Sequence, residues 1–309
     1  MSLVEFEGRS VIVTGAGGGL GREYALALAQ RGARVLVNDL GGTVNGEGGN
    51  SSMADAVVQE IKDAGGEAAA CYDSVATPEG GRAIVEASMD AFGSVDAVIH
   101  NAGILRDRSL TKLTSDEVDA VLDVHLRGGF NVTIPAFERM KEARYGRLVM
   151  TSSSSGLLGN FGQANYGAAK TGLVGLMHVA AIEGAKHGIL SNAIAPGART
   201  RMTEGLLGDM DELLDPAQVA AMAVYLASPQ CTQTHEIFSA GGGRFARYVV
   251  GVNEGWITPN GPASADDVLE HIDQIRDLDT LQVFDSGTDE MALLHRMAVA
   301  AGALRPTSS

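Results

Sequence analysis

Residues 10–28 read SVIVTGAGGGLGREYALAL, a short apolar run, a glycine-rich turn and then apolar residues at helical spacing. An apolar run of this length is typical of a parallel strand that is covered on both faces. Glycines let the backbone approach a pyrophosphate, and the N-terminus of the following helix supplies N–H groups and a positive dipole end. The stretch predicts a dinucleotide site, although a tight turn that only needs glycine would look the same. Its spacing is TGxxxGxG and does not satisfy GxGxxG.

The glycine-rich turn supplies the first candidate cofactor contacts, and the end of the next predicted strand supplies another. Those in the turn are Gly15, Gly19, Leu20 and Gly21. Asp39 follows the strand predicted at 34–38 and lies 20 residues after Gly19, where an acidic side chain accepts hydrogen bonds from both ribose hydroxyls of adenosine. A carboxylate there repels a 2′-phosphate, so Asp39 predicts NAD rather than NADP. A solvated loop aspartate is the alternative.

Strand and helix patterns alternate along the rest of the chain. Further strands are predicted at 68–72, 97–100, 147–150, 191–195 and 236–238. Helices are predicted at 53–64, 78–92 and 216–226, and a buried helix that continues through Ile182 is predicted at 166–182. This alternation predicts a single α/β domain with a Rossmann-type, doubly wound parallel sheet over residues 1–245. Residues 246–309 are predicted to form a C-terminal extension, with a capped amphipathic helix from Ser264, that packs on the same domain or on a partner subunit.

Two groups of small or polar residues follow the third and fourth predicted strands. They are Asp73, Ser74 and Val75, and Asn101, Ala102 and Gly103. Because ligands of open parallel sheets bind outside the carboxyl ends of the strands, both groups are candidate cofactor contacts, the first of them for the adenine. The small residues at 101–103 fit a turn that braces the sheet as well as they fit direct contact with a cofactor.

Tyr166 and Lys170 stand four residues apart, so a helix places them on one face. Ser153 follows the strand predicted at 147–150 and can meet a tyrosine at the start of the next helix. A phenol titrates at about 10, too high for a base at neutral pH, and a lysine ammonium one turn away lowers its pKa. The three residues predict proton transfer at a carbinol oxygen that the serine hydroxyl holds. A serine-rich turn before a helix with an incidental Tyr and Lys is the alternative.

Composition narrows the class of protein. The 309 residues carry a formal net charge of −15, which argues against a nucleic-acid coat or a membrane-surface protein. Cys71 and Cys231 form neither a metal spacing nor a disulfide framework, so no metal site is predicted. The N-terminal residues lack the features of a signal peptide, and no apolar run is long enough to span a bilayer. These observations predict a cytoplasmic protein without nucleic-acid partners or membrane insertion.

Taken together, the motifs resemble the short-chain dehydrogenase/reductase family over residues 8 to about 240. The residues that carry the resemblance are Thr14–Gly15 with Gly19 and Gly21, Asn101–Ala102–Gly103, Ser153, Tyr166, Lys170 and Pro196–Gly197. Within this family, the stretches VNDLGG (37–42), NAGILRDRSL (101–110) and GNFGQANYGAAK (159–170) are similar to the (3R)-hydroxyacyl-CoA dehydrogenase part of the peroxisomal multifunctional enzyme of type 2.

The resemblance implies a role for each matching residue. Tyr166 would be the acid–base group, Lys170 its pKa tuner and ribose anchor, and Ser153 the partner of the substrate oxygen. Further cofactor contacts would be Pro196, Gly197, Ala198 and Thr200, although this threonine comes one residue earlier than the common spacing. His125 stands where many members have an asparagine that supports a proton-relay water, which implies a modified relay. By its position on an apolar helix face, His125 fits a core residue as well.

The implied reaction is the NAD-dependent oxidation of a (3R)-3-hydroxyacyl-CoA to the 3-oxoacyl-CoA by hydride transfer, in a homodimer or homotetramer. Arg106, Arg108 and Arg201 are candidates for contact with the CoA phosphates, with ordinary surface arginines as the alternative. Three other functions remain open. They are a hydroxysteroid or steroid-CoA dehydrogenase, an NADPH-dependent 3-oxoacyl carrier-protein reductase, against which Asp39 argues, and a catalytically silent nucleotide-binding sensor.

Overall fold

The computed structural model describes residues 3–43, 45–46, 48–49, 51–198, 213–258 and 261–304. The chain divides into two compact units, Met1–Arg247 and Tyr248–Ser309. The predicted parallel sheet lies in the first of them.

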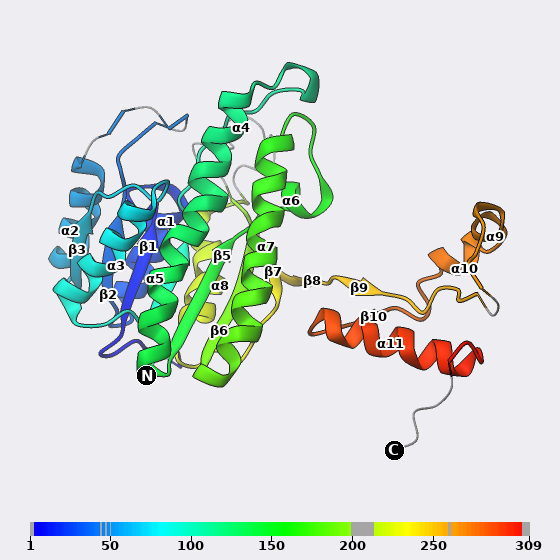
Figure 1. Cartoon of the computed structure of the whole chain (residues 1–309). Helices are drawn as coiled ribbons and strands as arrows, with labels where there is room; N and C mark the ends of the chain where they lie inside the picture. Colours follow the sequence, from blue (N-terminus) through cyan, green and yellow to red (C-terminus); the bar gives the residue numbers. More distant parts are fainter. Residues whose placement is uncertain are drawn as a thin grey trace. The chain divides into compact units, whose positions relative to one another are not determined.

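Figure 1 shows the first unit as a central sheet with helices on both faces. The sheet has eight strands in the order β3-β2-β1-β4-β5-β6-β7-β8. They are β1 (Ser10–Thr14), β2 (Arg34–Asn38), β3 (Glu67–Cys71), β4 (Ala97–His100), β5 (Gly146–Thr151), β6 (Ile189–Gly197), β7 (Ile237–Gly241) and β8 (Arg244–Tyr248). Every pair from β3 to β7 in this order is parallel, which confirms the predicted doubly wound Rossmann-type fold.

The strand order reverses beside β1, which pairs with β2 on one side and with β4 on the other. Ligands of open α/β sheets bind outside the carboxyl ends of the strands at such a switch point. The glycine-rich turn after β1 and residues 101–103 after β4 meet there. Their backbones are so close that a Cβ on Gly15 would lie 2.7 Å from the Cα of Ala102.

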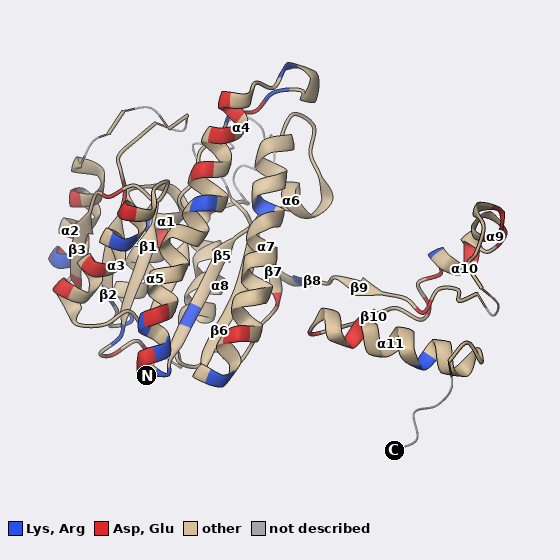
Figure 2. Ribbon diagram, viewed as in Figure 1, with Lys and Arg blue, Asp and Glu red and all other residues tan. Residues whose placement is uncertain are grey.

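Helices cover both faces of the sheet, with α1, α2 and α8 on one side and α3, α5 and α7 on the other (Figure 1). Their bounds, with those of α4 and α6 near the carboxyl ends of the strands, are α1 (Gly19–Ala29), α2 (Ser52–Asp63), α3 (Pro78–Phe92), α4 (Ser115–Leu122), α5 (Gly128–Ala143), α6 (Ser154–Leu158), α7 (Ala164–Gly184) and α8 (Pro216–Ala227). Because both faces are covered, β1 and β5 are buried along their whole length. Most charged residues lie on helices and loops (Figure 2).

A π-helical turn over Asp123–Arg127 joins α4 to α5. The predicted capping box at the start of α4 is present, with Thr114 and Glu117 each accepting from the other's backbone N–H. His125 lies inside the π-turn and is only 1% exposed, so its predicted inward position is confirmed. Such turns interrupt the regular α-helical hydrogen bonds and often occur at functional sites.

The helix that begins near Tyr166 is less fully buried than its sequence predicts. Leu173 and Met177 are buried against the sheet, but Val179 and Ile182 are 53% and 50% exposed. The prediction of a buried helix through Ile182 is therefore wrong at this end, because α7 turns one apolar side away from the sheet. None of the described helices has the length and apolarity that crossing a membrane requires.

The second unit is built from short elements. A two-stranded antiparallel pair joins β9 (Gly251–Val252) to β10 (Gln282–Val283). The amphipathic helix predicted from Ser264 is instead two helices, α9 (Ala265–Glu270) and α10 (Ile272–Arg276), broken at His271. The unit also contains α11 (Gly287–Ala300). The ring of His271 stacks on Trp256 with ring centroids 4.1 Å apart, and this contact accompanies the break.

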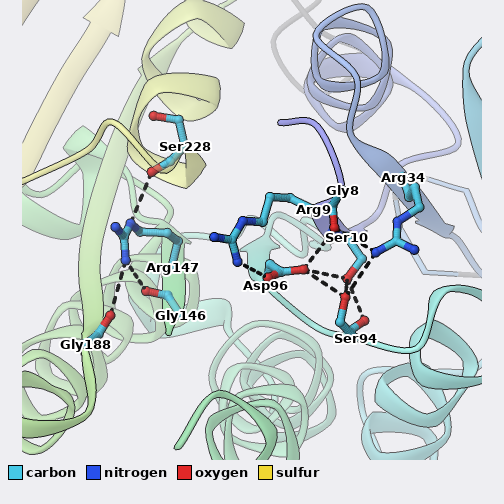
Figure 3. Close-up of polar contacts among 10 residues, drawn as sticks. All are labelled: Gly8, Arg9, Ser10, Arg34, Ser94, Asp96, Gly146, Arg147, Gly188 and Ser228. Atoms are coloured by element: carbon cyan, nitrogen blue, oxygen red, sulfur yellow. Dashed lines mark hydrogen bonds and ion pairs between the residues drawn. The ribbon is translucent and has the colours of Figure 1, made fainter. Parts of the chain in front are cut away.

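A polar network ties the strands together at their amino ends, away from the carboxyl-end crevice (Figure 3). Asp96, just before β4, accepts from the guanidinium of Arg9 at 2.7 Å and from the backbone N–H of Ser10 at 2.9 Å. Arg147 is buried in β5 and donates to four main-chain carbonyls, those of Gly146, Gly188, Ser228 and Cys231. This end of the sheet is therefore held by charged hydrogen bonds.

Candidate functional site

A cavity of about 410 Å³ opens at the carboxyl ends of β1, β2, β3 and β4. Ten of the predicted cofactor residues line it, namely Gly15, Gly19, Leu20, Asp39, Asp73, Ser74, Val75, Asn101, Ala102 and Gly103. Its wall also includes residues that sequence reasoning did not select for the cofactor, among them Leu40, Thr43, Ile104, Arg106 and Val124. The sequence could have pointed to two of these additional residues, Ile104 and Arg106, because they continue the motif that begins at Asn101.

The glycine-rich turn has the shape that close approach of a ligand requires. Gly15 has φ of +65°, a conformation that favours glycine. The N-cap residue Gly18 offers no side-chain hydrogen bond to the start of α1, so the first N–H groups of that helix are available to an anion. Gly21, also predicted as a cofactor contact, is absent from the cavity wall. A Cβ there would lie 2.2 Å from the carbonyl oxygen of Gly15, so Gly21 lets the turn pack on the helix.

Asp39 is held on the cavity wall by two backbone N–H groups. Gly17 donates to its Oδ2 at 2.7 Å and Gly41 to its Oδ1 at 2.6 Å. Each carboxylate oxygen can accept more than one hydrogen bond, so both retain capacity for the hydroxyls of a ligand. The carboxylate is thus oriented in advance, as the predicted contact with a ribose requires.

Asn101 combines the two roles that the sequence left open. Its side-chain amide donates to the carbonyl oxygens of Thr14 and Gly15, each at 3.1 Å, and its backbone N–H is bonded to the hydroxyl of Thr14 at 3.0 Å. These bonds brace the glycine-rich turn against the end of β4. Asn101 also lines the cavity.

Ser153, Tyr166 and Lys170 come together beside this cavity. Lys170 is 3% exposed, and its ammonium donates to the carbonyl of Thr151 at 2.7 Å while lying 5.5 Å from the centre of the Tyr166 ring. Ser153 ends the segment after β5 as the N-cap of α6, where its hydroxyl accepts from the backbone N–H of Ser155 at 3.2 Å and is near enough to the Tyr166 phenol to lower the pKa of Tyr166. The strand end and the first two turns of α7 thus place a hydroxyl, a phenol and an ammonium in one group.

The electrostatics of this group differ from the prediction. Burial raises the pKa of Tyr166, the hydrogen bond from Ser153 lowers it, and the carboxylate of Asp107 raises it further. Burial lowers the pKa of Lys170 to about 7. The predicted lowering of the Tyr166 pKa by Lys170 is therefore not found, because desolvation disfavours both charged forms and the ammonium is directed to Thr151.

His125 packs against the Tyr166 ring edge-on, with ring centroids 5.2 Å apart. Its Nε2 lies 3.0 Å from the backbone nitrogen and 2.8 Å from the carbonyl oxygen of Ile104. Its Nδ1 is buried and has no hydrogen-bond partner among the described residues. Burial, and then the charge of Lys170, hold the pKa of His125 well below its ordinary value, so the ring is neutral. A Cβ on Gly103 would lie 2.3 Å from this ring, which explains the glycine.

The residues expected at the end of β6 lie outside the cavity wall. Of these, Pro196, Gly197 and Ala198 are described, and Gly197 packs against β7, where a Cβ on Gly241 would lie 2.3 Å from its carbonyl oxygen. Thr200 and Arg201 fall outside the described residues. Tyr166 and Lys170, expected to contact the cofactor as well as the substrate, do not line the cavity. Tyr166 packs against the cluster of apolar residues that contains Ile104, which does line it.

Known proteins with similar sequences and structures agree with this arrangement. The chain is 50% identical over 271 residues to Rv0148 of Mycobacterium tuberculosis, which is named as a short-chain type dehydrogenase/reductase, and the match covers 87% of this chain and 94% of that protein. It is 52% identical over 243 residues to the peroxisomal multifunctional enzyme type 2 of Mus musculus, covering 78% of this chain but only 33% of the mouse enzyme.

The full-length peroxisomal multifunctional enzyme type 2 from Drosophila melanogaster has a similar structure. It superimposes with a TM-score of 0.81 at 37% identity, covering 95% of this chain and 50% of that one. The chain thus spans a third to a half of these multifunctional enzymes. A profile of the short chain dehydrogenase family matches residues 9–210, most of the first unit. With the parallel sheet, the glycine-rich turn and the Ser153–Tyr166–Lys170 group in place, the chain belongs to the short-chain dehydrogenase family of oxidoreductases.

Proposed function

We propose that this protein is an NAD-dependent dehydrogenase that oxidises a (3R)-3-hydroxyacyl-CoA to the 3-oxoacyl-CoA. The observation that carries the proposal is the grouping of Ser153, Tyr166 and Lys170 beside a cavity whose wall holds Asp39. The first three supply proton transfer at a carbinol oxygen, and Asp39 favours a dinucleotide with an unphosphorylated ribose. The substrate class rests on the resemblance of residues 101–110 and 159–170 to hydroxyacyl-CoA dehydrogenases.

The residues around the cavity fit NAD. The first N–H groups of α1 and the open turn around Gly15 would hold the pyrophosphate, and Asp39 would hold the adenosine ribose. Leu40 and Val75 would cover the adenine with apolar surface. When bound, NAD supplies the acceptor for the hydride from the carbinol carbon.

The protein's own residues move the proton. Ser153 holds the hydroxyl oxygen of the substrate beside the phenol, and the Tyr166 oxygen, as tyrosinate, takes the hydroxyl proton as the carbonyl forms. Lys170, fixed on Thr151, would anchor a ribose of the dinucleotide. The neutral His125 ring packs edge-on against the Tyr166 ring and fixes the orientation of that ring.

Arg106 is proposed as the contact for a phosphate of the thioester or of the dinucleotide. It is the basic residue on the described cavity wall. Arg108, the second candidate, instead pairs with Glu117 at 2.5 Å and lies off that wall, and the third candidate, Arg201, is outside the described residues. An Arg106→Gln variant should raise the KM for the thioester, for NAD or for both, while Arg108→Gln should leave each KM unchanged.

We further propose that the chain forms a homodimer or homotetramer, with residues 246–309 packing on the first unit or on a partner subunit. In the second unit, the apolar side chains that are buried among the described residues are only Leu293 and Ala298, too few for an independent core. In the first unit, Ile134 on α5 and Ile182 on α7 are 56% and 50% exposed. A monomer in light scattering at micromolar concentration would contradict the oligomer.

A cofactor-by-substrate panel tests the reaction directly. The protein should reduce NAD in the presence of (3R)-3-hydroxyacyl-CoA thioesters and do so poorly with the (3S) isomers. Faster turnover of a free or CoA-linked hydroxysteroid would show that the substrate is a steroid and not a fatty acyl thioester. A preference for NADPH with a 3-oxoacyl carrier protein would show that the protein is a reductase that uses NADPH. Binding of NAD without turnover of any alcohol would favour a nucleotide sensor.

A further inference from the structure

Asn165 is a buried amide at the start of the catalytic helix, immediately before Tyr166. It is 3% exposed and is the second residue of α7. The backbone N–H groups in the first turn of a helix have no partner within the helix. Gln163, the N-cap of α7, makes no capping hydrogen bond with its side chain. The N–H of Tyr166 is instead bonded to the side-chain carbonyl of Asn165 at 2.8 Å.

The other end of the same amide reaches two segments that are distant in sequence. Its Nδ2 donates to the carbonyl of Arg106 at 3.0 Å and to the carbonyl of Glu117 at 3.1 Å. Arg106 belongs to the cavity wall after β4, and Glu117 lies in the first turn of α4. Asn165 therefore makes three hydrogen bonds, and it links Tyr166 to the cavity wall and to α4. The side-chain oxygen and nitrogen are told apart by these partners, because only the nitrogen can donate to carbonyls.

Neighbouring contacts fasten the same segment. The Gln163 side chain donates to Asp107 at 2.6 Å, and the backbone N–H of Arg108 donates to the carbonyl of Gly162 at 2.8 Å. The Arg108 guanidinium pairs with Glu117, which itself caps α4. The two side-chain contacts, Gln163 with Asp107 and Arg108 with Glu117, are exposed, whereas the hydrogen bonds of Asn165 are half-buried. Asn165 is therefore the best shielded link between these segments.

We infer that Asn165 is the positioning residue for Tyr166, and that it fixes the phenol relative to the wall of the cofactor cavity by joining α7, α4 and the segment after β4. This inference rests on the proposed acid–base role of Tyr166. Asn165 does not touch the reacting atoms. It acts by holding the first turn of α7 and the backbone of Arg106 in one arrangement, and small displacements of a catalytic group are costly.

Two substitutions test this role. Asn165→Ala removes all three hydrogen bonds and should lower kcat by about 100-fold, the size expected for a displacement of about 1 Å, with little change in the KM for NAD. Asn165→Asp keeps the acceptor for Tyr166 but turns a carboxylate oxygen toward two carbonyls. At the high pH where Tyr166 titrates, this carboxylate is ionised and disfavours the phenolate, so the pKa of Tyr166 and the pH–rate profile should both move upward.

The charged or titratable groups that face Tyr166 are Lys170 on α7, His125 in the π-turn and Asp107 after β4, with the Arg108–Glu117 pair beyond Asn165. None of them is altered by these substitutions, so a shift would come from position 165. The pKa of Tyr166 is measured without turnover as the difference in tyrosinate absorbance between each protein and its Tyr166→Phe counterpart. This titration can be measured even if the protein does not catalyse the proposed reaction.

Asn192 on β6 provides a matched control. It is also a buried amide, and it donates to the carbonyl of Gln233 at 2.7 Å and accepts from the backbone N–H of Glu236 at 3.2 Å, away from the site. Asn192→Ala should lower the melting temperature without moving kcat or the tyrosinate titration. Asn165 variants that behave the same way would overturn the inference. If Asn165→Ala does not fold, the nearly isosteric Asn165→Asp decides.

Discussion

The ammonium of Lys170 donates a hydrogen bond of 2.7 Å to the main-chain carbonyl of Thr151, the last residue of β5. The lysine is buried, and burial lowers its pKa to about 7. A lysine side chain is thus held inside the protein by a carbonyl, with its nitrogen 5.5 Å from the centre of the Tyr166 ring. Because the charged form of Lys170 is disfavoured by burial, its position lowers the stability of the folded protein.

Replacing this lysine should therefore stabilise the fold. In the unfolded chain the Lys170 pKa is about 10.5, so folding at neutral pH must either bury the charge or release a proton. Each unit of depression corresponds to about 1.4 kcal/mol, and the lost bond to Thr151 offsets part of the gain. We expect Lys170→Met to be more stable than the parent by on the order of 2 kcal/mol at pH 7, and inactive. The difference should shrink as the pH rises toward 10, as urea unfolding at several pH values would show. A less stable Met variant at pH 7 would contradict this account.

Oxidation by this protein should accelerate in alkaline solution. Burial raises the pKa of Tyr166 above its ordinary value of 10.0, and the proton of the alcohol moves to the ionised phenol. In the proposed direction kcat should rise with pH through the neutral and mildly alkaline range. Tyr166→Phe should lower kcat by at least about 1,000-fold, within the range reported for general acid–base groups. The measurement is a pH–rate profile of both proteins, and a Phe variant with parental activity would remove Tyr166 from the mechanism.

The choice between NAD and NADP should depend on Asp39. Its carboxylate is held by Gly17 and Gly41 on the cavity wall, and its charge would repel a 2′-phosphate. Asp39→Asn keeps an acceptor but removes the charge, so the ratio of kcat/KM for NADP to that for NAD should rise by about tenfold, equivalent to 1.4 kcal/mol. Asp63→Asn, an exposed change on α2 with a single partner in Gln59, is the control and should leave the ratio alone.

The fold should lose stability in moderately acidic solution. Burial lowers the pKa of His100 and of His178 to about 4, against an ordinary value of 6.5. Between pH 4 and pH 6.5 both rings are neutral in the folded protein and protonated in the unfolded chain. Their contribution to the free energy of unfolding is therefore complete above pH 6.5 and is lost as the pH falls toward 4. Urea midpoints should fall through this window. His178→Gln should flatten the decline, whereas His295→Gln, on the exposed side of α11, should not.

Arg147 should matter for stability and not for catalysis. It is 7% exposed, donates to four carbonyls and stacks its guanidinium 4.5 Å from the centre of the Tyr145 ring. Arg147→Met keeps the apolar part of the side chain but leaves those carbonyls without their hydrogen-bond donor. We therefore expect a loss of about 3 kcal/mol in the free energy of unfolding and an unchanged KM. Arg139, whose ion pair with Glu142 is exposed, provides the comparison. Arg139→Met should lower the free energy of unfolding by less than about 1 kcal/mol.

Several features could be predicted from local sequence because neighbouring residues decide them. The strand at 10–14, the glycine-rich turn and Asp39 follow from residue type and spacing, and the structure places the turn and Asp39 on the wall of one cavity. The four-residue spacing of Tyr166 and Lys170 likewise fixes them on one side of α7. Oligomeric state, cytoplasmic location and acyl-CoA as substrate stay predictions.

Tertiary structure decided what depends on partners far apart in the chain. The direction of the Tyr166 pKa could not be deduced from the nearby lysine, because burial by the whole fold outweighs one charge. The selection of Arg106 over Arg108 required the cavity wall and the ion pair with Glu117. Asn165 carried no signal in the sequence, since its partners lie 59 and 48 residues away. Residue type and spacing thus determined which chemistry the chain can perform, and long-range packing decided how its groups are charged and held, because desolvation and hydrogen bonds between distant segments exist only once the chain has folded.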